Sequence, residues 1–152
     1  YGVPTISLRY FTVYGPRQRP DMAIHKFIQA ALREGKVIVF GDGTQTRDFT
    51  YISDIVDANI IVAESKVEGE VFNVGSGNPL SVNNLIKMIE EALGKQLEIN
   101  YEKKQYGDVG HTWADISKAK EMLRWEPRID IHKGLRKFIE WFKEAMVGRE
   151  SN

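Results

Sequence analysis

Residues 5–13, TISLRYFTV, are rich in β-branched and aromatic side chains and predict a β-strand. Alternation divides its side chains into two faces, Ile6, Leu8, Tyr10 and Thr12 on one and Ser7, Arg9, Phe11 and Val13 on the other. Neither face is polar throughout, as expected of a strand covered on both sides in a parallel sheet. No earlier segment is available to pair with it. The sequence therefore predicts that the chain begins inside a larger parallel sheet.

The segments after this strand alternate between loop, helix and strand. Residues 14–20, YGPRQRP, are loop chemistry, and apolar residues at helical spacing predict an amphipathic helix over 24–31 that ends near Gly35. Two β-rich runs flank a Gly-Asp-Gly turn, so residues 37–52 are predicted to form a hairpin. The other expected elements are helices that begin near Ser53, Ser81 and Ser117, a last helix around 135–142, and strands over 70–74 and 97–101. This alternation predicts a mixed α/β (α+β) fold.

The composition bounds the classes of function. The 152 residues, 42% of them hydrophobic, are enough for one sizeable core. Lys and Arg together number 21, as do Asp and Glu, so no basic field favours a nucleic-acid partner. No apolar run has the length of a membrane span, and the absence of cysteine fits a reducing cytoplasm. The three histidines lie far apart in sequence, so no metal site is expected.

The most tempting local motif is the glycine turn at residues 75–77, which follows a predicted strand and precedes a predicted helix. This placement imitates the phosphate-binding turn of dinucleotide-binding domains. However, Leu80 stands where the third glycine of the fingerprint belongs, and Pro79 stiffens the turn. A purely structural turn is therefore favoured.

Two charged residues also have a functional and a structural interpretation. Arg47 follows the Gly-Asp-Gly turn, and its guanidinium suits a diphosphate, but a salt bridge to Asp48 or Asp54 is the simpler account. Asp108 lies in a glycine-punctuated loop, where it could accept hydrogen bonds from sugar hydroxyls or merely form the turn. Local spacing alone favours the structural account for both.

Four ordered strings change this assessment: SLRYFTVYGPRQRP, VIVFGDGTQTRDFTYISDI, EVFNVGSGNPLSV and GDVGHTWADISKAKEMLRWEP. In this order and spacing they resemble the C-terminal half of NAD-dependent epimerases and dehydratases, the extended short-chain dehydrogenases, with UDP-glucose 4-epimerase as the nearest type. The resemblance runs over nearly the whole chain, and it reverses the local preference at Arg47.

The resemblance implies a division of labour within a longer enzyme. Residues 1–16 would end the dinucleotide-binding Rossmann sheet, and residues 17–152 would form the domain that binds the nucleotide sugar. NAD would be held mainly by an upstream half that also carries a Tyr-x-x-x-Lys catalytic pair. No Tyr of this chain is followed four positions later by Lys. The chain alone would therefore be inactive and would contain no catalytic residue.

Site residues follow from the same resemblance. Arg47 and Asp108 would contact the diphosphate and ribose, Met22 and Ala23 would lie beside the phosphates at a helix start, and the backbone of Ile38, Val39 and Phe40 would face the base. Phe11, with Tyr10 next to it, would border the nicotinamide end of NAD. Thr12 replaces a usual asparagine and Gln105 a usual arginine, with Lys103 and Lys104 as candidates for the missing charge. Tyr51 and Asp54 match structural positions.

The resemblance leaves several alternatives open. A nucleotide-sugar 4,6-dehydratase or a UDP-glucuronate decarboxylase would begin with the same oxidation at C4. A non-catalytic nucleotide-binding module is an alternative of another class. Apolar side chains of residues 5–13 would be exposed without the rest of the sheet, which predicts a homo-oligomer or association through this strand.

Overall fold

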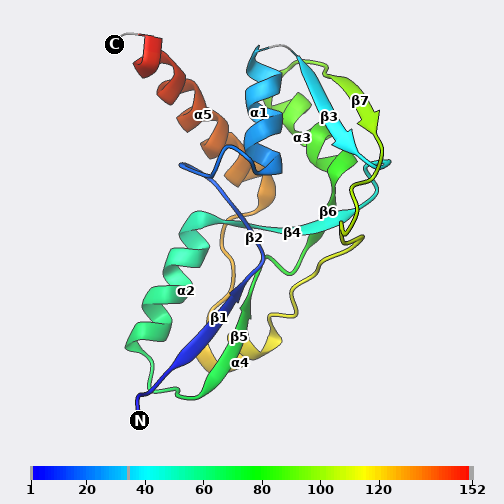
Figure 1. Cartoon of the computed structure of the whole chain (residues 1–152). Coiled ribbons are helices and arrows are strands. Elements are labelled where there is room, and N and C mark those ends of the chain that lie inside the picture. Colours follow the sequence, from blue (N-terminus) through cyan, green and yellow to red (C-terminus); the bar gives the residue numbers. More distant parts are fainter. Residues whose placement is uncertain (1, 34, 151–152) are drawn as a thin grey trace.

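The structure is a computed structural model that describes residues 2–33 and 35–150, with side chains as far as residue 146. Helices and strands alternate along the chain, as expected of a mixed α/β fold (Figure 1). In order they are β1 (Ile6–Tyr10), β2 (Thr12–Tyr14), α1 (Ala23–Arg33), β3 (Lys36–Phe40), β4 (Thr46–Tyr51), α2 (Ile52–Glu64), β5 (Glu70–Val74), β6 (Pro79–Ser81), α3 (Val82–Leu93), β7 (Glu98–Glu102), α4 (Ser117–Leu123) and α5 (Ile131–Glu150).

The strands form three small sheets. β1 pairs in parallel with β5, and β3 pairs in parallel with β7. The central sheet has the order β2-β4-β6, in which β2 is parallel and β6 antiparallel to β4. β4 therefore crosses the middle of the molecule between two partners.

The prediction of one strand over residues 5–13 is wrong in detail. Phe11 interrupts it, and its N–H donates to the Val74 carbonyl at 3.1 Å before the chain leaves β5 and pairs with β4. Two short strands in two different sheets result. The two faces are also unequal, because Ser7, Arg9 and Tyr10 are exposed while Ile6 and Leu8 are half-buried.

The predicted hairpin over residues 37–52 is also wrong, because β3 and β4 join different sheets. Their burial explains why. Val37 and Val39 are buried and Ile38 is half exposed, so β3 has one buried face, whereas residues 48–51 of β4 are all buried and need partners on both edges. Gly41 and Gly43, at φ 81° and 75°, turn the chain from one sheet to the other.

The helix predicted to begin near Ser81 is capped by that serine, whereas the helix predicted to begin near Ser53 is not capped by Ser53. The Ser81 hydroxyl accepts the Asn84 N–H at 3.2 Å, and Gly94 ends α3 in the left-handed conformation at φ 62°. By contrast, α2 follows directly from β4, so Tyr51 holds the cap position without a side-chain bond and Ser53 lies inside the helix.

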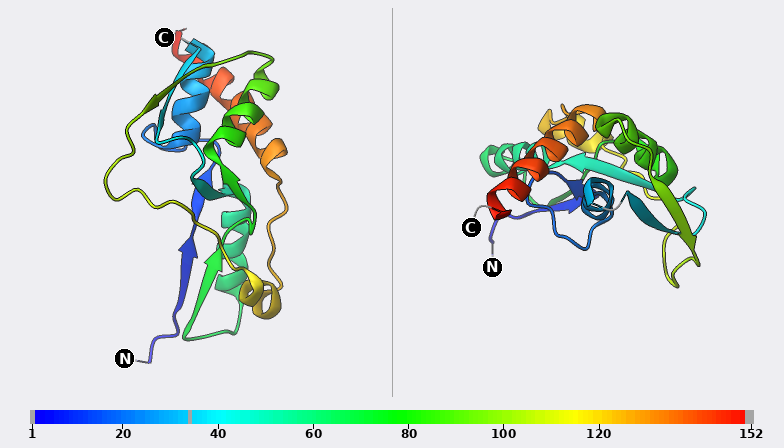
Figure 2. Two further views of the ribbon diagram at one scale, coloured as in Figure 1. Left: turned by 90° about the vertical axis from the view of Figure 1, so that its right-hand side faces the viewer. Right: turned by 90° about the horizontal axis from the view of Figure 1, so that it is seen from above.

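Two hydrophobic clusters lie at opposite ends of an elongated molecule (Figure 2). One lies among α1, α3, α5, β3 and β4. The other joins β1, α2, β5 and α4, with Phe72, Val74 and Trp125 at its centre. The packing unit that contains the first strand thus extends to α2, β5 and α4, well beyond residues 1–16.

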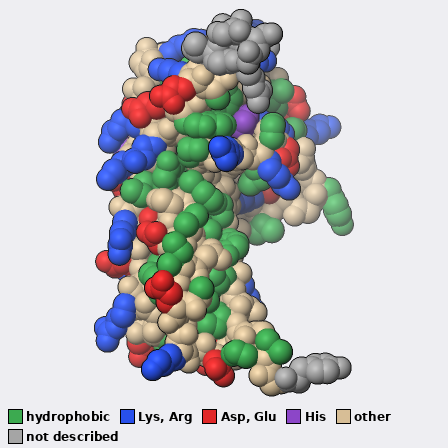
Figure 3. Space-filling view, turned by 90° about the vertical axis from the view of Figure 1, so that its left-hand side faces the viewer, with side chains coloured by type: hydrophobic (Ala, Val, Ile, Leu, Met, Phe, Trp, Pro, Cys, Tyr) green, Lys and Arg blue, Asp and Glu red, His purple; other side chains and the backbone are tan. Residues whose placement is uncertain are grey.

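Besides Tyr10 of the first strand, which is 47% exposed, hydrophobic side chains are exposed on α2. They run down the face that this helix occupies (Figure 3), where Val56 and Ile60 are 48% and 51% exposed. Association of copies of the chain, predicted from residues 5–13, stays a prediction. In the described part of the chain, no helix combines the length and apolar character that a membrane span needs.

The buried carboxylate of Asp48 connects β4 to two distant segments. Its oxygens accept the N–H groups of Ser76 at 2.6 Å, Gly77 at 2.9 Å and Ala114 at 3.1 Å. The N–H groups of Ser76 and Gly77 are those that a dinucleotide-binding turn would offer to a phosphate. The glycine turn at residues 75–77 therefore holds a carboxylate of its own chain, in agreement with the structural interpretation.

Candidate functional site

A cleft of about 350 Å³ lies between the start of α1, the strands β3 and β4, and the loop before His111. All nine residues proposed from the sequence to bind substrate line this cleft. They are Thr12, Met22, Ala23, Ile38, Val39, Phe40, Arg47, Gln105 and Asp108. Segments up to 96 positions apart, from Thr12 to Asp108, are thus brought together by the fold.

The guanidinium of Arg47 is held in one orientation within the cleft. Its Nη1 donates to the carbonyls of Thr46 at 2.8 Å and Gly110 at 3.4 Å, and its Nη2 donates to Asp108 Oδ1 at 2.5 Å. The predicted alternative of a salt bridge to Asp48 or Asp54 is wrong, since the partner is Asp108. A guanidinium has five N–H donors, so two remain without a partner among the described residues.

The loop that carries Asp108 is fastened to the first residue of β4. Thr46 N donates to the Gly110 carbonyl at 3.0 Å, and Thr112 N donates to the Thr46 carbonyl at 3.1 Å. The Thr46 hydroxyl and His111 Nδ1 lie 3.0 Å apart. Because Arg47 is the next residue of the strand, these bonds place Asp108 and Arg47 on the same rigid frame.

The start of α1 forms another wall of the cleft. Ala23 is the first helical residue, and the Met22 carbonyl accepts the Lys26 N–H at 3.0 Å in the first turn. The first N–H groups of a helix have no partner inside it and point along the axis, which favours a negative charge. Met22 and Ala23 therefore lie at a helix start that faces the cleft, and their contact with phosphates stays a prediction.

The edge of β3 forms the wall where the base was predicted. β3 pairs with β7 on one side only, so its other edge has backbone groups available. The Phe40 carbonyl is already used, because it accepts Gln45 Nε2 at 2.7 Å. Gly35 and Gly41 bond to β7, and alternation along the strand directs the Val39 backbone to β7 as well. Backbone recognition at this wall is thus left to Ile38 and the Phe40 N–H.

The cleft also contains residues that the sequence interpretation missed, namely Asp21, Lys26, Phe27, Gln45, Phe49 and Val82. Lys26 is the most consequential, because it supplies a second cation. The signal for it was its position three residues after Ala23, which puts it on the same face of the helix start. Lys103 and Lys104 do not line the cleft; Lys104 lines a neighbouring hollow beside Gly41 and Asp42.

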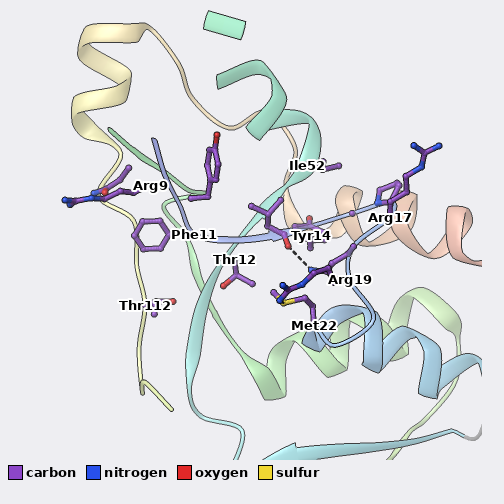
Figure 4. A pocket seen from close by; sticks show the side chains of 15 residues that line it. Arg9, Phe11, Thr12, Tyr14, Arg17, Arg19, Met22, Ile52 and Thr112 are labelled. Carbon is purple, nitrogen blue, oxygen red and sulfur yellow. Dashed lines mark hydrogen bonds between the residues drawn. The ribbon is translucent and has the colours of Figure 1, made fainter. Parts of the chain in front are cut away.

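A larger cleft of about 1090 Å³ adjoins the first, and Thr12 and Met22 line both. Tyr10 and Phe11, the residues predicted to face the cofactor, line this larger cleft. Three arginines line it as well, with Arg9 and Phe11 on one side of Thr12 and Arg17 and Arg19 on the other (Figure 4). None of the described residues that line this cleft is a carboxylate, although Arg19 pairs with Asp21 outside the lining, so the cleft has a net positive charge.

Tyr14 is the tyrosine at the back of the larger cleft, and it is unsuited to proton transfer. Its side chain is buried, and its hydroxyl has no hydrogen-bond partner among the described residues. Burial raises the pKa of the Tyr14 hydroxyl far above its ordinary value. Tyr14 is therefore a packing residue.

Comparison with known proteins connects this geometry to a family. The sequence model of the NAD dependent epimerase/dehydratase family matches residues 1–75. A UDP-glucuronate 4-epimerase of Thermodesulfobacterium geofontis is 49% identical over 146 residues, which cover 95% of this chain and 45% of that protein. The chain spans about half the length of such curated relatives.

Two solved structures are similar throughout. The UDP-glucose 4-epimerase of Thermotoga maritima with UDP-glucose has a TM-score of 0.91 at 40% identity, over 96% of this chain and 48% of that one. The UDP-glucuronic acid 4-epimerase of Bacillus cereus, in complex with UDP-glucuronic acid and NAD, has a TM-score of 0.90 at 43% identity, over 94% and 46% of the two chains.

The paired parallel strands and their helices define a mixed α/β protein with a cleft around a fixed guanidinium. More particularly, the chain belongs to the NAD-dependent epimerase/dehydratase family. The family resemblance predicted from the four ordered strings is confirmed.

Proposed function

We propose that the chain is the nucleotide-sugar-binding portion of an NAD-dependent 4-epimerase that interconverts UDP-glucose and UDP-galactose. The observation that carries this proposal is the convergence of nine residues from separate segments on one cleft around Arg47. Residues 1–16 would contribute to the dinucleotide-binding sheet, and residues 17–152 would form most of the nucleotide-sugar domain.

Each wall of the cleft then has a role in binding. The two N–H donors that Arg47 has left would bind oxygens of the diphosphate, and Asp108 would keep the guanidinium aligned while it accepts a ribose hydroxyl. The start of α1 would receive the phosphates, and Ile38 and the Phe40 N–H would offer backbone groups to the base. Rigid anchoring of the nucleotide suits an epimerase, because the sugar must turn over while the nucleotide stays in place.

The cofactor fits this chain only in part. Phe11 and Tyr10 line the larger cleft, so the chain offers a surface for one end of NAD. The one glycine turn that resembles a pyrophosphate site is filled by Asp48. When bound, NAD would supply the group that accepts a hydride from C4 and returns it. We propose that residues outside this chain hold most of the cofactor and that the chain alone is inactive.

A second candidate substrate is UDP-glucuronate. The observation in its favour is the larger cleft beside Thr12, which has three arginines and no carboxylate in its lining. A carboxylate on the sugar would be attracted to such a cleft, whereas the neutral hydroxymethyl group of UDP-glucose would not. The relative from Thermodesulfobacterium geofontis, which is 49% identical and is named a UDP-glucuronate 4-epimerase, supports this candidate.

One experiment on the complete protein with NAD distinguishes the two candidate substrates. UDP-glucose and UDP-glucuronate are supplied separately, and the products are identified by NMR. A product inverted at C4 from either one supports the 4-epimerase proposal and names the substrate. A 4-keto-6-deoxy sugar or a pentose would instead identify a dehydratase or a decarboxylase. Tight UDP binding without any product would favour a non-catalytic module.

A further inference from the structure

The charges that line the substrate cleft are not all paired. Two carboxylates and two cations lie in its walls: Asp21, Asp108, Lys26 and Arg47. Asp108 pairs with Arg47, and Asp21 pairs outside the cleft with Arg19 at 3.0 Å. Among the residues that the structure describes, Lys26 has no carboxylate within ion-pair distance, and its side chain is exposed to the cleft and solvent.

In this arrangement the positive charge of Arg47 alone is not enough to balance a diphosphate. A diphosphate diester carries two negative charges, and much of the charge of Arg47 is balanced by Asp108 at 2.5 Å. Lys26 stands in the first turn of α1, at the wall where Met22 and Ala23 would receive the phosphates. Its ammonium group, on a flexible four-carbon stem, can reach a phosphate oxygen without the fixed geometry of a guanidinium.

We propose that Lys26 is the second phosphate-binding cation of the cleft and balances the charge that the Arg47–Asp108 pair leaves uncompensated. The proposal rests on the proposed function, since it assumes that a nucleoside diphosphate occupies the cleft. It assigns the phosphate contact to a helix residue, whereas sequence reasoning had looked for the missing cation at Lys103 and Lys104 in the loop.

The test is calorimetric titration of UDP, the part common to both candidate substrates, into the complete protein. Four proteins are compared, the wild type and the variants Lys26→Met, Lys26→Arg and Lys66→Met. Lys66 is an equally exposed lysine in the loop between α2 and β5, so its variant controls for a change in overall charge. Each titration is run at low and high salt, because a charge contact weakens with salt and a packing contact does not.

Lys26→Met should raise the Kd for UDP about tenfold at low salt, because it removes one charge-assisted contact. The difference from the wild type should shrink at high salt, Lys26→Arg should stay within about threefold of the wild type, and Lys66→Met should match it.

Two other outcomes overturn the proposal in distinguishable ways. If Lys26→Met binds UDP within about twofold of the wild type at both salt concentrations, Lys26 is no phosphate ligand, although the cleft still binds the nucleotide. If the wild type binds no UDP at all, both this inference and the proposed function are wrong.

Discussion

Nη2 of Arg47 and Oδ1 of Asp108 lie 2.5 Å apart, although the residues are 61 positions apart in sequence. Both side chains are half-buried, at 21% and 27% exposure, and the loop of Asp108 is hydrogen-bonded to the backbone of Thr46 through Gly110 and Thr112. The pair therefore belongs to the frame of the cleft before any ligand arrives.

The first prediction concerns this pair. Asp108→Ala should lower the free energy of unfolding by only about 1 kcal/mol or less, because a partly exposed ion pair contributes little to stability. It should nevertheless weaken UDP binding, since the guanidinium loses the partner that aligns it and the ribose loses an acceptor. Calorimetry and thermal denaturation of the same sample separate the two effects. A large loss of stability with unchanged affinity would contradict the assignment.

A second prediction concerns the contact between Tyr14 and α5. A Cβ added at Gly134 would lie 1.9 Å from the Tyr14 hydroxyl oxygen, so the helix can approach the core only because residue 134 is glycine. Gly134→Ala should destabilise the complete protein by about 2–4 kcal/mol through overpacking. Thermal denaturation measures the loss.

The same contact offers its own control. The Tyr14 hydroxyl has no partner among the described residues, so Tyr14→Phe should be neutral or slightly stabilising. Combined with Gly134→Ala, it should restore part of the lost stability, because it removes the oxygen that the new methyl group meets. Additive losses in the double variant would show that the crowding lies elsewhere.

The third prediction concerns Asp48. Asp48→Asn keeps the shape of the side chain but replaces one acceptor oxygen by an NH₂ group that faces backbone N–H donors. We expect a loss of about 2–3 kcal/mol in the free energy of unfolding. Asp57→Asn, on the adjacent helix α2, is the matched control and should change little. Equal stability of both variants would mean that the turn at residues 75–77 does not depend on Asp48.

The fourth prediction concerns pH. Asp130 Oδ1 accepts the Lys133 N–H at 2.9 Å at the start of α5, and this bond holds the pKa of Asp130 below its ordinary value of 3.8. Because the folded pKa is the lower one, the stabilisation by the charged form is present above pH 3.8 and is lost as the pH falls below it. Asp130→Ala should cost about 1 kcal/mol at neutral pH, and the difference should shrink in acid. Asp130→Asn keeps the capping bond without the charge. The difference in stability between Asp130→Asn and Asp130→Ala should therefore not depend on pH.

Sequence reasoning succeeded where the information is local or where several motifs combine. Ser81 was enough to place the start of α3, because its capping bond to the Asn84 N–H is local. The resemblance based on the four ordered strings was enough to name nine residues of the cleft, although these residues are far apart in the sequence.

It failed where tertiary partners decide the structure. Phe11 ends β1 because Val74 is the last residue of its partner strand, and β4 leaves β3 because its two edges pair with β2 and β6. Neither partner can be read from the residues beside the break. Similarly, the sequence suggested only nearby carboxylates such as Asp48 as ion-pair partners of Arg47. In the structure the Asp48 carboxylate accepts three backbone N–H groups instead, and the partner is the distant Asp108.

The last prediction tests the central claim, that Arg47 anchors a nucleoside diphosphate. UDP is titrated into the complete protein and its Arg47→Ala variant, with Arg136→Ala, an exposed arginine of α5, as the control. Loss of charge-assisted bonds to phosphate should raise the Kd of Arg47→Ala about ten- to a hundredfold and leave the control unchanged. A Kd for Arg47→Ala equal to that of the wild type would contradict the account.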